Sequence, residues 1–188
     1  SGQGGQRPEH WQQVQAGVTG ELRQALQRAL PGMADANAAV DPEKLAKNSI
    51  AQPLIFAQQM LLWAKLQPRV PRPVCAAGYS LGEMAACSAA GMFDAVAGLD
   101  LCVERARLMD GAVSGEQGML AVLGLDDARV AQLAADAGLA VAIRNAPQHL
   151  VVAGPRAGII AVAAKFEAAG ASRLVHLAVQ TPSHTPLR

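Results

Sequence analysis

The sequence has no run of about 18 apolar residues that would cross a membrane, and it does not open with the pattern of a signal peptide. It also has no excess of charge of one sign, because the formal net charge of the 188 residues is +1 and acids and bases are interspersed. A broad basic face is what nucleic acid or an anionic membrane requires, so neither is expected as a partner. The sequence therefore predicts a cytoplasmic, water-soluble protein.

Cysteine is scarce, with three residues that are odd in number and widely spaced at Cys75, Cys87 and Cys102. Their neighbours are mostly Ala, Val and Leu, which favours small buried side chains over disulfides or metal ligands. Internal repeats and low-complexity tracts are absent as well.

The chain is long enough for one large domain, or for one domain that carries a smaller insert. It begins with serine and runs directly into Gly2-Gln3-Gly4-Gly5-Gln6, and it stops after Thr181-Pro182-Ser183-His184-Thr185-Pro186-Leu187-Arg188. Neither end reads as a helix or strand. We therefore expect the folded protein to need sequence beyond both ends.

Apolar residues at helical spacing predict helices over much of the first half of the chain. A surface helix is expected over residues 21–30, and a buried helix over 50–66, with Pro53 near its start. The short apolar run Val74 to Ala77 predicts a strand. Helices should follow from Leu81 to Ala90 and from the capping residue Asp94 to Val113.

After Gly118 the pattern changes to strand, helix, strand, twice over, which is the order of a split βαβ or ferredoxin-like unit. We interpret residues 118–180 as a small subdomain inserted into an α/β body made of residues 1–117 and 181–188. The six predicted elements cover residues 119–125, 127–137, 140–144, 150–153, 156–169 and 173–179.

The most informative segment is Gly78-Tyr79-Ser80-Leu81-Gly82, a Gly-x-Ser-x-Gly motif between the predicted strand and an alanine-rich helix. Such a motif is typical of a nucleophile elbow, in which small flanking residues let the backbone double back and expose the serine. The first N–H groups of the following helix can then hold an oxyanion.

The Gly2–Gln6 motif, the serine motif extended by Glu83, and Pro182-Ser183-His184 occur in one order along the chain. Together they resemble the malonyl-CoA:acyl carrier protein transacylase family, which includes the acyltransferase domains of polyketide and fatty acid synthases. The resemblance covers essentially the whole sequence and implies an α/β-hydrolase-like body with a parallel sheet. It also implies malonyl-CoA as donor, an acyl carrier protein as acceptor and partner, and no permanently bound cofactor or metal.

Carried over by position, the resemblance makes Ser80 the nucleophile and His184 its general base and acid, a task that suits a group titrating near neutrality. It makes the backbone N–H groups of Leu81 and Gln3 the oxyanion hole. The ferredoxin-like insert would return the chain to the elbow, since its two ends lie near each other.

Arg105 matches the arginine that holds the free carboxylate of a malonyl group in this family. On a helical wheel it borders an apolar stripe, and Leu101 and Leu108 are its other neighbours. Its planar guanidinium can bind a carboxylate through two parallel N–H donors. Without the resemblance, a helix arginine with its charge in water would be the simpler interpretation.

Gln52 and Asn145 match polar positions of the family's cleft, although each could equally cap a helix or a turn. Tyr79 stands where the family usually has histidine. With this tyrosine, the sequence resembles the malonate decarboxylase epsilon subunit. That subunit loads malonyl onto the CoA-like thiol of its own carrier subunit.

The predicted reaction is ping-pong acyl transfer through a malonyl-serine ester to a pantetheine thiol. A serine hydrolase is an alternative, since it uses the same motif with an acid between serine and histidine. The acids in that interval, Asp126, Asp127 and Asp136, fall in the predicted insert. A carrier-docking subunit with a decayed site is the non-enzymatic alternative.

Overall fold

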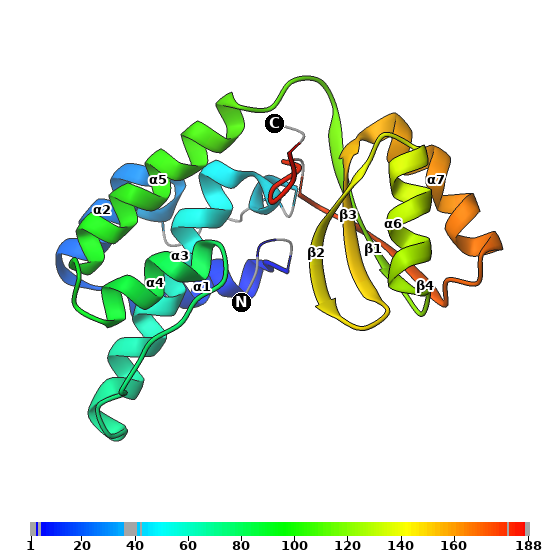
Figure 1. Cartoon of the computed structure of the whole chain (residues 1–188). Coiled ribbons are helices and arrows are strands. Elements are labelled where there is room, and N and C mark those ends of the chain that lie inside the picture. Colours follow the sequence, from blue (N-terminus) through cyan, green and yellow to red (C-terminus); the bar gives the residue numbers. More distant parts are fainter. Residues whose placement is uncertain (1–2, 4, 36–40, 42, 180, 187–188) are drawn as a thin grey trace. The chain divides into compact units, whose positions relative to one another are not determined.

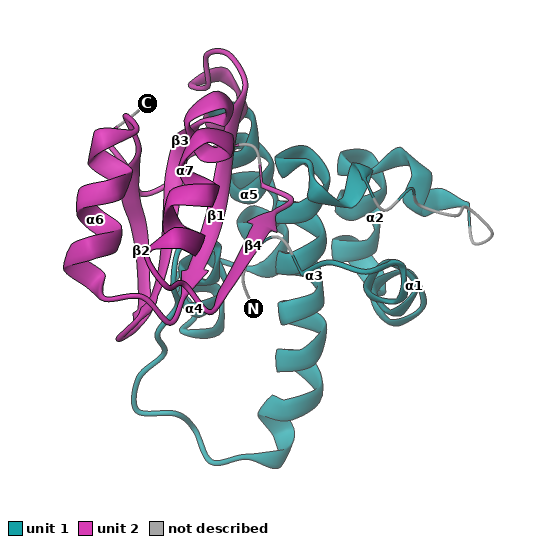
Figure 2. Cartoon of the chain, turned by 90° about the vertical axis from the view of Figure 1, so that its right-hand side faces the viewer, with its two compact units in different colours: residues 1–108 teal, residues 109–188 magenta. Residues whose placement is uncertain are grey.

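A computed structural model of the chain describes residues 3, 5–35, 41, 43–179 and 181–186. The chain divides into two compact units, Ser1–Leu108 and Met109–Arg188, coloured separately in Figure 2. Each unit has its own hydrophobic core. The assignment of residues 181–188 to the body, with 118–180 as an insert, stays a prediction.

Unit 1 is helical in the part of the chain that is described (Figure 1). Its α-helices are α1 (Pro8–Gly17), α2 (Gly20–Ala29), α3 (Asn48–Leu66), α4 (Leu81–Ala89) and α5 (Ala95–Gly111), with short 3-10 turns at Pro31–Ala34, Lys44–Ala46 and Gln67–Arg69. The helices predicted over residues 21–30, 50–66 and 81–90 are confirmed within one or two residues. Asp94 caps α5 as predicted, because its Oδ1 accepts a hydrogen bond of 2.8 Å from the Ala97 N–H.

Helix α3 is the centre of this unit, since its first half is buried on nearly every side. Leu54, Ile55 and Phe56 are at most 2% exposed, as expected for a helix that is apolar around its circumference. Helices α1, α2 and α4 pack against it. Gly98 on α5 lies directly against the ring of Phe56, so this ring reaches α5 at a position that has no side chain.

The predicted strand from Val74 to Ala77 is wrong. Residues 71–79 have no regular structure and are exposed, and Val74 is fully so. A strand is held by hydrogen bonds to a neighbouring strand, and the described residues of unit 1 form none. The prediction that all three cysteines are buried fails for the same reason, because Cys75 lies in this exposed segment while Cys87 is half-buried and Cys102 buried.

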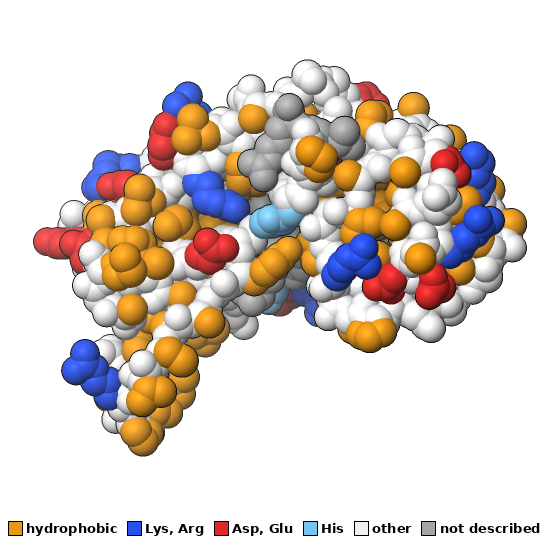
Figure 3. Space-filling view, in the orientation of Figure 1, with side chains coloured by type: hydrophobic (Ala, Val, Ile, Leu, Met, Phe, Trp, Pro, Cys, Tyr) orange, Lys and Arg blue, Asp and Glu red, His pale blue; other side chains and the backbone are white. Residues whose placement is uncertain are grey.

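This segment forms one wall of a cavity of about 1080 Å³. Residues of α3 and α4, including Met60, Trp63 and Ala85, form the other walls. Nearby, hydrophobic side chains gather on the surface at the projecting end of α3, where Leu62 and Leu66 are exposed (Figure 3).

Unit 2 has the six elements predicted for it, in the predicted order. They are β1 (Gln117–Leu123), α6 (Asp127–Asp136), β2 (Ala140–Ala146), β3 (His149–Pro155), α7 (Arg156–Ala168) and β4 (Arg173–Leu177). The strands form one antiparallel sheet in the order β2-β3-β1-β4.

Alternating side chains of β1 and β3 point to opposite faces of the sheet. Leu120, Val122, Leu150 and Val152 belong to the core under α6 and α7, and Met119, Ala121, Val151 and Ala153 form the opposite apolar face.

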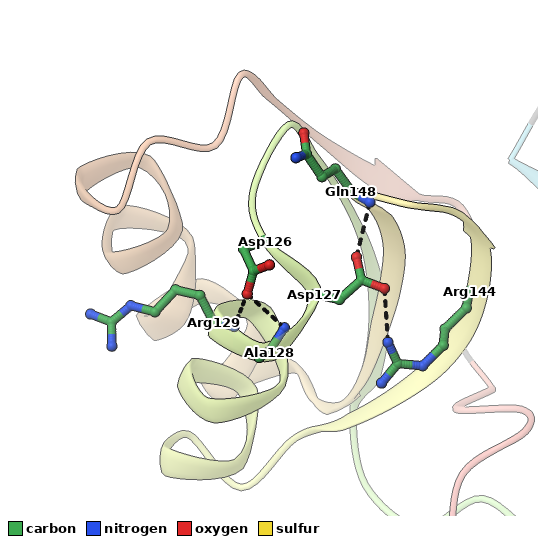
Figure 4. A network of polar contacts seen from close by, with 6 residues as sticks. All are labelled: Asp126, Asp127, Ala128, Arg129, Arg144 and Gln148. Atoms are coloured by element: carbon green, nitrogen blue, oxygen red, sulfur yellow. Dashed lines mark hydrogen bonds and ion pairs between the residues drawn. The ribbon is translucent and has the colours of Figure 1, made fainter.

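Two adjacent aspartates hold the start of α6, and the second of them ties it to the β2–β3 hairpin (Figure 4). Asp126 caps the helix by accepting hydrogen bonds from the Ala128 and Arg129 N–H groups at 3.0 and 3.2 Å. Asp127 accepts from the Gln148 N–H at 2.9 Å and pairs with Arg144 at 3.0 Å. Gln148 has a φ of 57°, so its carboxylate partner stabilises a turn that a non-glycine residue rarely adopts.

Across the described parts of the chain, we find no helix that has both the length and the apolar character of a membrane span.

We expect Gly98→Ala to lower the free energy of unfolding by about 1–3 kcal/mol, because the added methyl group overlaps the buried Phe56 ring. Gly111→Ala in the same helix is the matched control, since a Cβ at Gly111 meets nothing within 4 Å. Urea unfolding of both variants measures the difference. Equal stabilities would contradict the close contact between the Phe56 ring and Gly98.

Candidate functional site

The backbone at Ser80 has the geometry that the Gly-x-Ser-x-Gly motif predicts. Ser80 has φ 54° and ψ −118° and lies directly before α4, which begins at Leu81. A Cβ on Gly78 would overlap the backbone of Gly82 and Glu83, so the chain can double back here only with glycine. Gly82, in contrast, has open space around its Cα. The elbow therefore depends on the first glycine of the motif.

The side chain of Glu83 stabilises the turn, a role that was not predicted from the sequence. Its Oε1 accepts a hydrogen bond of 3.2 Å from the Ser80 N–H. The Ser-x-x-Glu spacing of a capping box was the signal that could have revealed this contact.

The other early N–H groups of α4 differ in their partners. Those of Gly82 and Glu83 donate to the carbonyl groups of Tyr79 and Ser80 at 2.9 and 3.0 Å. The Leu81 N–H has no acceptor among the residues described here. Since a helix N-terminus favours negative charge, this N–H can donate to an oxyanion formed beside Ser80.

Arg105 and Gln52 meet at the nucleophile. The Arg105 Nη2 donates to Ser80 Oγ at 3.1 Å, and its Nη1 donates to Gln52 Oε1 at 2.8 Å. Arg105 is half-buried on α5, and Gln52 is fully buried on α3. Three helices thus bring together three of the predicted site residues.

Within the described ranges, no acid neutralises the charge of Arg105. None of the described carboxylates lies within ion-pairing distance of it, whereas Arg107, two residues on, pairs with Glu104 at 2.6 Å on the surface. A half-buried guanidinium whose acceptors are an amide and a hydroxyl keeps its attraction for an anion. The predicted neighbours Leu101 and Leu108 are exposed instead, and the buried face of α5 is formed by Leu99, Cys102 and Ala106.

Cys102 lies one turn before Arg105 and is fully buried. Burial raises the pKa of its thiol to about 12, and the positive charge of Arg105 opposes that rise only in part. Its thiol therefore stays protonated at neutral pH, and we assign it a packing role.

Gln3 holds the N-terminal segment against the start of α3. Its Nε2 donates to Asn48 Oδ1 at 2.7 Å and to the Ala46 carbonyl at 3.2 Å. Gly2 and Gly4 of the same motif lie outside the described residues. The assignment of the Gln3 N–H to an oxyanion hole stays a prediction.

His184 belongs to unit 2 and lies in a short irregular turn after Thr181. The Thr185 Oγ1 donates to the Pro182 carbonyl at 2.7 Å, and the Ser183 N–H donates to the Thr181 carbonyl at the same distance. His184 itself is exposed and has a φ of 63°. Its pairing with Ser80 stays a prediction.

Ser80, Gln148 and His184 are the non-glycine residues with positive φ in the described ranges. Gln148 is explained by its hairpin turn. The other two are the predicted nucleophile and base, which agrees with the tendency of backbone strain to cluster at functional sites.

Asn145 and Tyr79 are both exposed. Asn145 lies on β2, where its Nδ2 is 3.3 Å from His149 Nε2 across the hairpin. This contact fits the turn-capping alternative. Tyr79 is 61% exposed and accepts the Gly82 N–H through its carbonyl.

The acids that a hydrolase triad would need all have structural contacts. Asp126 and Asp127 hold the start of α6, and Asp136 accepts a hydrogen bond of 2.9 Å from Gln132 within that helix. In the described part of the chain, no group of three His, Cys, Asp or Glu residues is arranged to hold a metal ion. The site in unit 1 thus offers a strained serine, a helix N–H and a cation, which together suit attack on an acyl group that carries a negative charge.

Comparison with known proteins agrees with this chemistry. The family model described as acyl transferase domain matches residues 19–187. The chain is 33% identical to the malonyl CoA-acyl carrier protein transacylase of Salmonella typhimurium over 151 residues, which are 77% of this chain and 49% of that protein. It is 38% identical to the polyketide biosynthesis protein ThaF of Burkholderia thailandensis over 146 residues, which are 76% of this chain and 12% of that protein.

Among solved structures, the chain is similar to a complex described as a type II polyketide synthase acyl carrier protein with its malonyl-transacylase. The TM-score is 0.80 at 28% identity, and the match covers 99% of this chain and 63% of the other. A crystal structure of an acyl carrier protein S-malonyltransferase from Vibrio cholerae gives a TM-score of 0.72 at 28% identity, covering 95% of this chain and 58% of the other. The chain spans about half the length of the curated transacylase from Salmonella.

We expect iodoacetamide at pH 8 to label Cys75 rapidly in the folded protein and to leave Cys102 unmodified until the protein unfolds. The reagent attacks thiolate, and the pKa of about 12 suppresses the thiolate of Cys102. Peptide mass spectrometry with and without urea locates the label. Labelling of Cys102 in the folded state at the rate of Cys75 would contradict its burial.

Proposed function

The chain belongs to the acyl transferase domain family, and we propose that it transfers a malonyl group from malonyl-CoA to the phosphopantetheine-type thiol of an acyl carrier protein. It would then be an acyl carrier protein S-malonyltransferase. The observation that carries the proposal is the contact of Arg105 with the Ser80 hydroxyl at 3.1 Å, without a carboxylate partner among the described residues.

In the first half of the reaction, Ser80 Oγ attacks the thioester carbonyl while His184 takes the hydroxyl proton. The negative charge on the carbonyl oxygen is held by the N–H groups of Leu81 and Gln3. The tetrahedral intermediate collapses, the C–S bond breaks, and the CoA thiolate takes the proton back from His184. The products are malonyl-serine and free CoA.

In the second half, a carrier thiol gives its proton to His184 and attacks the ester carbonyl of malonyl-serine. The C–O bond breaks, and Ser80 recovers the proton from His184. No cofactor takes part, since every group that moves is a proton or the acyl group.

Arg105 supplies the specificity in this proposal. The free carboxylate of the malonyl group binds its guanidinium through parallel N–H···O bonds, which a lysine cannot reproduce. The same contact holds the acyl group in one orientation, so that its ester carbonyl faces the incoming thiol. An acetyl group has no such anchor.

The finer fold assignments belong to the same proposal. An α/β-hydrolase-like body would include a parallel sheet, to which the described residues of unit 1 contribute no strand. Residues 118–180 of unit 2 would be the ferredoxin-like insert, supported by their βαββαβ order and the strand order β2-β3-β1-β4. Residues 181–188 would then return to the body with His184; Leu187 and Arg188 lie outside the described residues.

The proposal also names the kind of carrier protein that accepts the malonyl group. A neighbour in structure is a transacylase bound to an acyl carrier protein of a type II polyketide synthase, and we assign a carrier of that general kind here. Tyr79 was the residue that favoured the malonate decarboxylase carrier. Substrate contact by Asn145, which the resemblance implies, remains part of the proposal. Tyr79 is exposed beside the nucleophile, a position from which it can contact either carrier's arm.

We expect Ser80→Ala to abolish covalent loading. Wild-type protein mixed with malonyl-CoA should gain the mass of one malonyl group, whereas the variant should gain none and transfer to a carrier should fall by at least about 10³-fold. Intact-mass measurement reads both. Undiminished transfer by the variant would reject the covalent mechanism, and rapid release of malonate without a carrier would favour the hydrolase.

We expect Arg105→Ala to reduce the preference for malonyl-CoA over acetyl-CoA by about 100-fold, because it removes charge-assisted hydrogen bonds to the donor's carboxylate. Arg107→Ala is the matched control, since Arg107 lies on the same helix in an exposed pair with Glu104. The ratio of kcat/KM for the two donors measures the preference. An unchanged ratio in Arg105→Ala would reject the role of Arg105.

A further inference from the structure

We infer that Gln52 is a positioning residue, which sets the preference for a carboxylate-bearing donor by fixing the guanidinium of Arg105. The inference rests on the proposed function and assigns Gln52 a role other than direct contact with the substrate. Gln52 has no exposed surface, so it acts through the residue that it holds.

The burial of Gln52 is costly unless its amide forms hydrogen bonds. It lies on α3 between Ala51 and Pro53, and the residues that follow, Leu54 to Ala57, are all buried and apolar. An amide in such surroundings keeps one orientation, because turning it away from its partner leaves a buried acceptor unsatisfied. The short bond of 2.8 Å from Arg105 Nη1 directs the amide oxygen of Gln52 toward the guanidinium.

Two acceptors on two different helices fix the plane of the guanidinium. Gln52 Oε1 on α3 accepts from Nη1, and Ser80 Oγ at the start of α4 accepts from Nη2. When an acyl group occupies Ser80, its oxygen becomes an ester and the contact to Nη2 changes. The bond from Gln52 does not depend on the acylation state of the serine, so it is the one that can hold Arg105 throughout the reaction.

The chemical type of the acceptor matters as much as its place. An amide oxygen orients the guanidinium without cancelling its charge, whereas a glutamate at the same position would form a buried ion pair and compete with the substrate's carboxylate. A neutral glutamine therefore combines fixed geometry with full charge.

Binding measurements in a Ser80→Ala background test the inference without requiring transfer. The Kd values of malonyl-CoA and acetyl-CoA are measured by calorimetry for four proteins: Ser80→Ala alone, with Gln52→Met, with Arg105→Met, and with both. Methionine keeps the length of glutamine but has no amide acceptor. We expect Gln52→Met to reduce the malonyl preference, the ratio of the two Kd values, by about tenfold.

The double variant distinguishes positioning from packing. If Gln52 acts through Arg105, then Gln52→Met changes the malonyl preference no further once Arg105→Met is present. An equal tenfold loss in both backgrounds, or an equal loss of affinity for both donors, would overturn the inference. Gln58→Met is the matched control on α3, where Gln58 forms only a surface contact of 3.4 Å with Gln13, and its malonyl preference should equal that of the parent.

Gln52→Glu provides a second test that does not rely on a methionine in the core. It keeps the acceptor oxygen but neutralises Arg105, so we expect the malonyl preference to fall at least tenfold with thermal stability retained. Full malonyl preference in this variant would overturn the argument. Failure of the proposed function has a different signature, because wild-type protein mixed with malonyl-CoA would then gain no malonyl mass. The binding measurements report on Gln52 whether or not the protein transfers the malonyl group.

Discussion

The proposed chemistry depends on one half-buried cation whose charge is left available. Arg105 reaches the serine hydroxyl from one helix, takes its orientation from a buried amide on a second, and meets the nucleophile at the start of a third. If a carboxylate replaced the amide, the charge would be cancelled before a substrate arrived. If the amide were exposed, water would compete for its oxygen, and the arginine would lose its fixed orientation.

Local sequence signals predicted most of the regular structure. The six elements of unit 2 were found because strand and helix periodicities alternate there and turn residues separate them. The start of α5 was found because Asp94 has the chemistry of a capping residue. The segment from Val74 to Ala77 failed because strand formation depends on a neighbour, and composition does not reveal whether one is present.

The site was predictable in its residues but not in its contacts. The motif around Ser80 gave the elbow, and the resemblance gave Arg105 and Gln52 as separate positions. Their joining into one hydrogen-bonded chain is a tertiary fact, since 53 residues separate Gln52 from Arg105. The bond from the Ser80 N–H to Glu83 is local, and the Ser-x-x-Glu spacing of a capping box was its signal in the sequence.

The left-handed backbone at Ser80 sets stability against reactivity at one residue. Glycine adopts such a φ without steric cost, whereas serine is disfavoured there. Glycine at this position would relax the turn and remove the hydroxyl in the same step. The fold therefore gives up some backbone stability wherever the turn carries a side chain with an oxygen, as is common where strain is stored at a functional site.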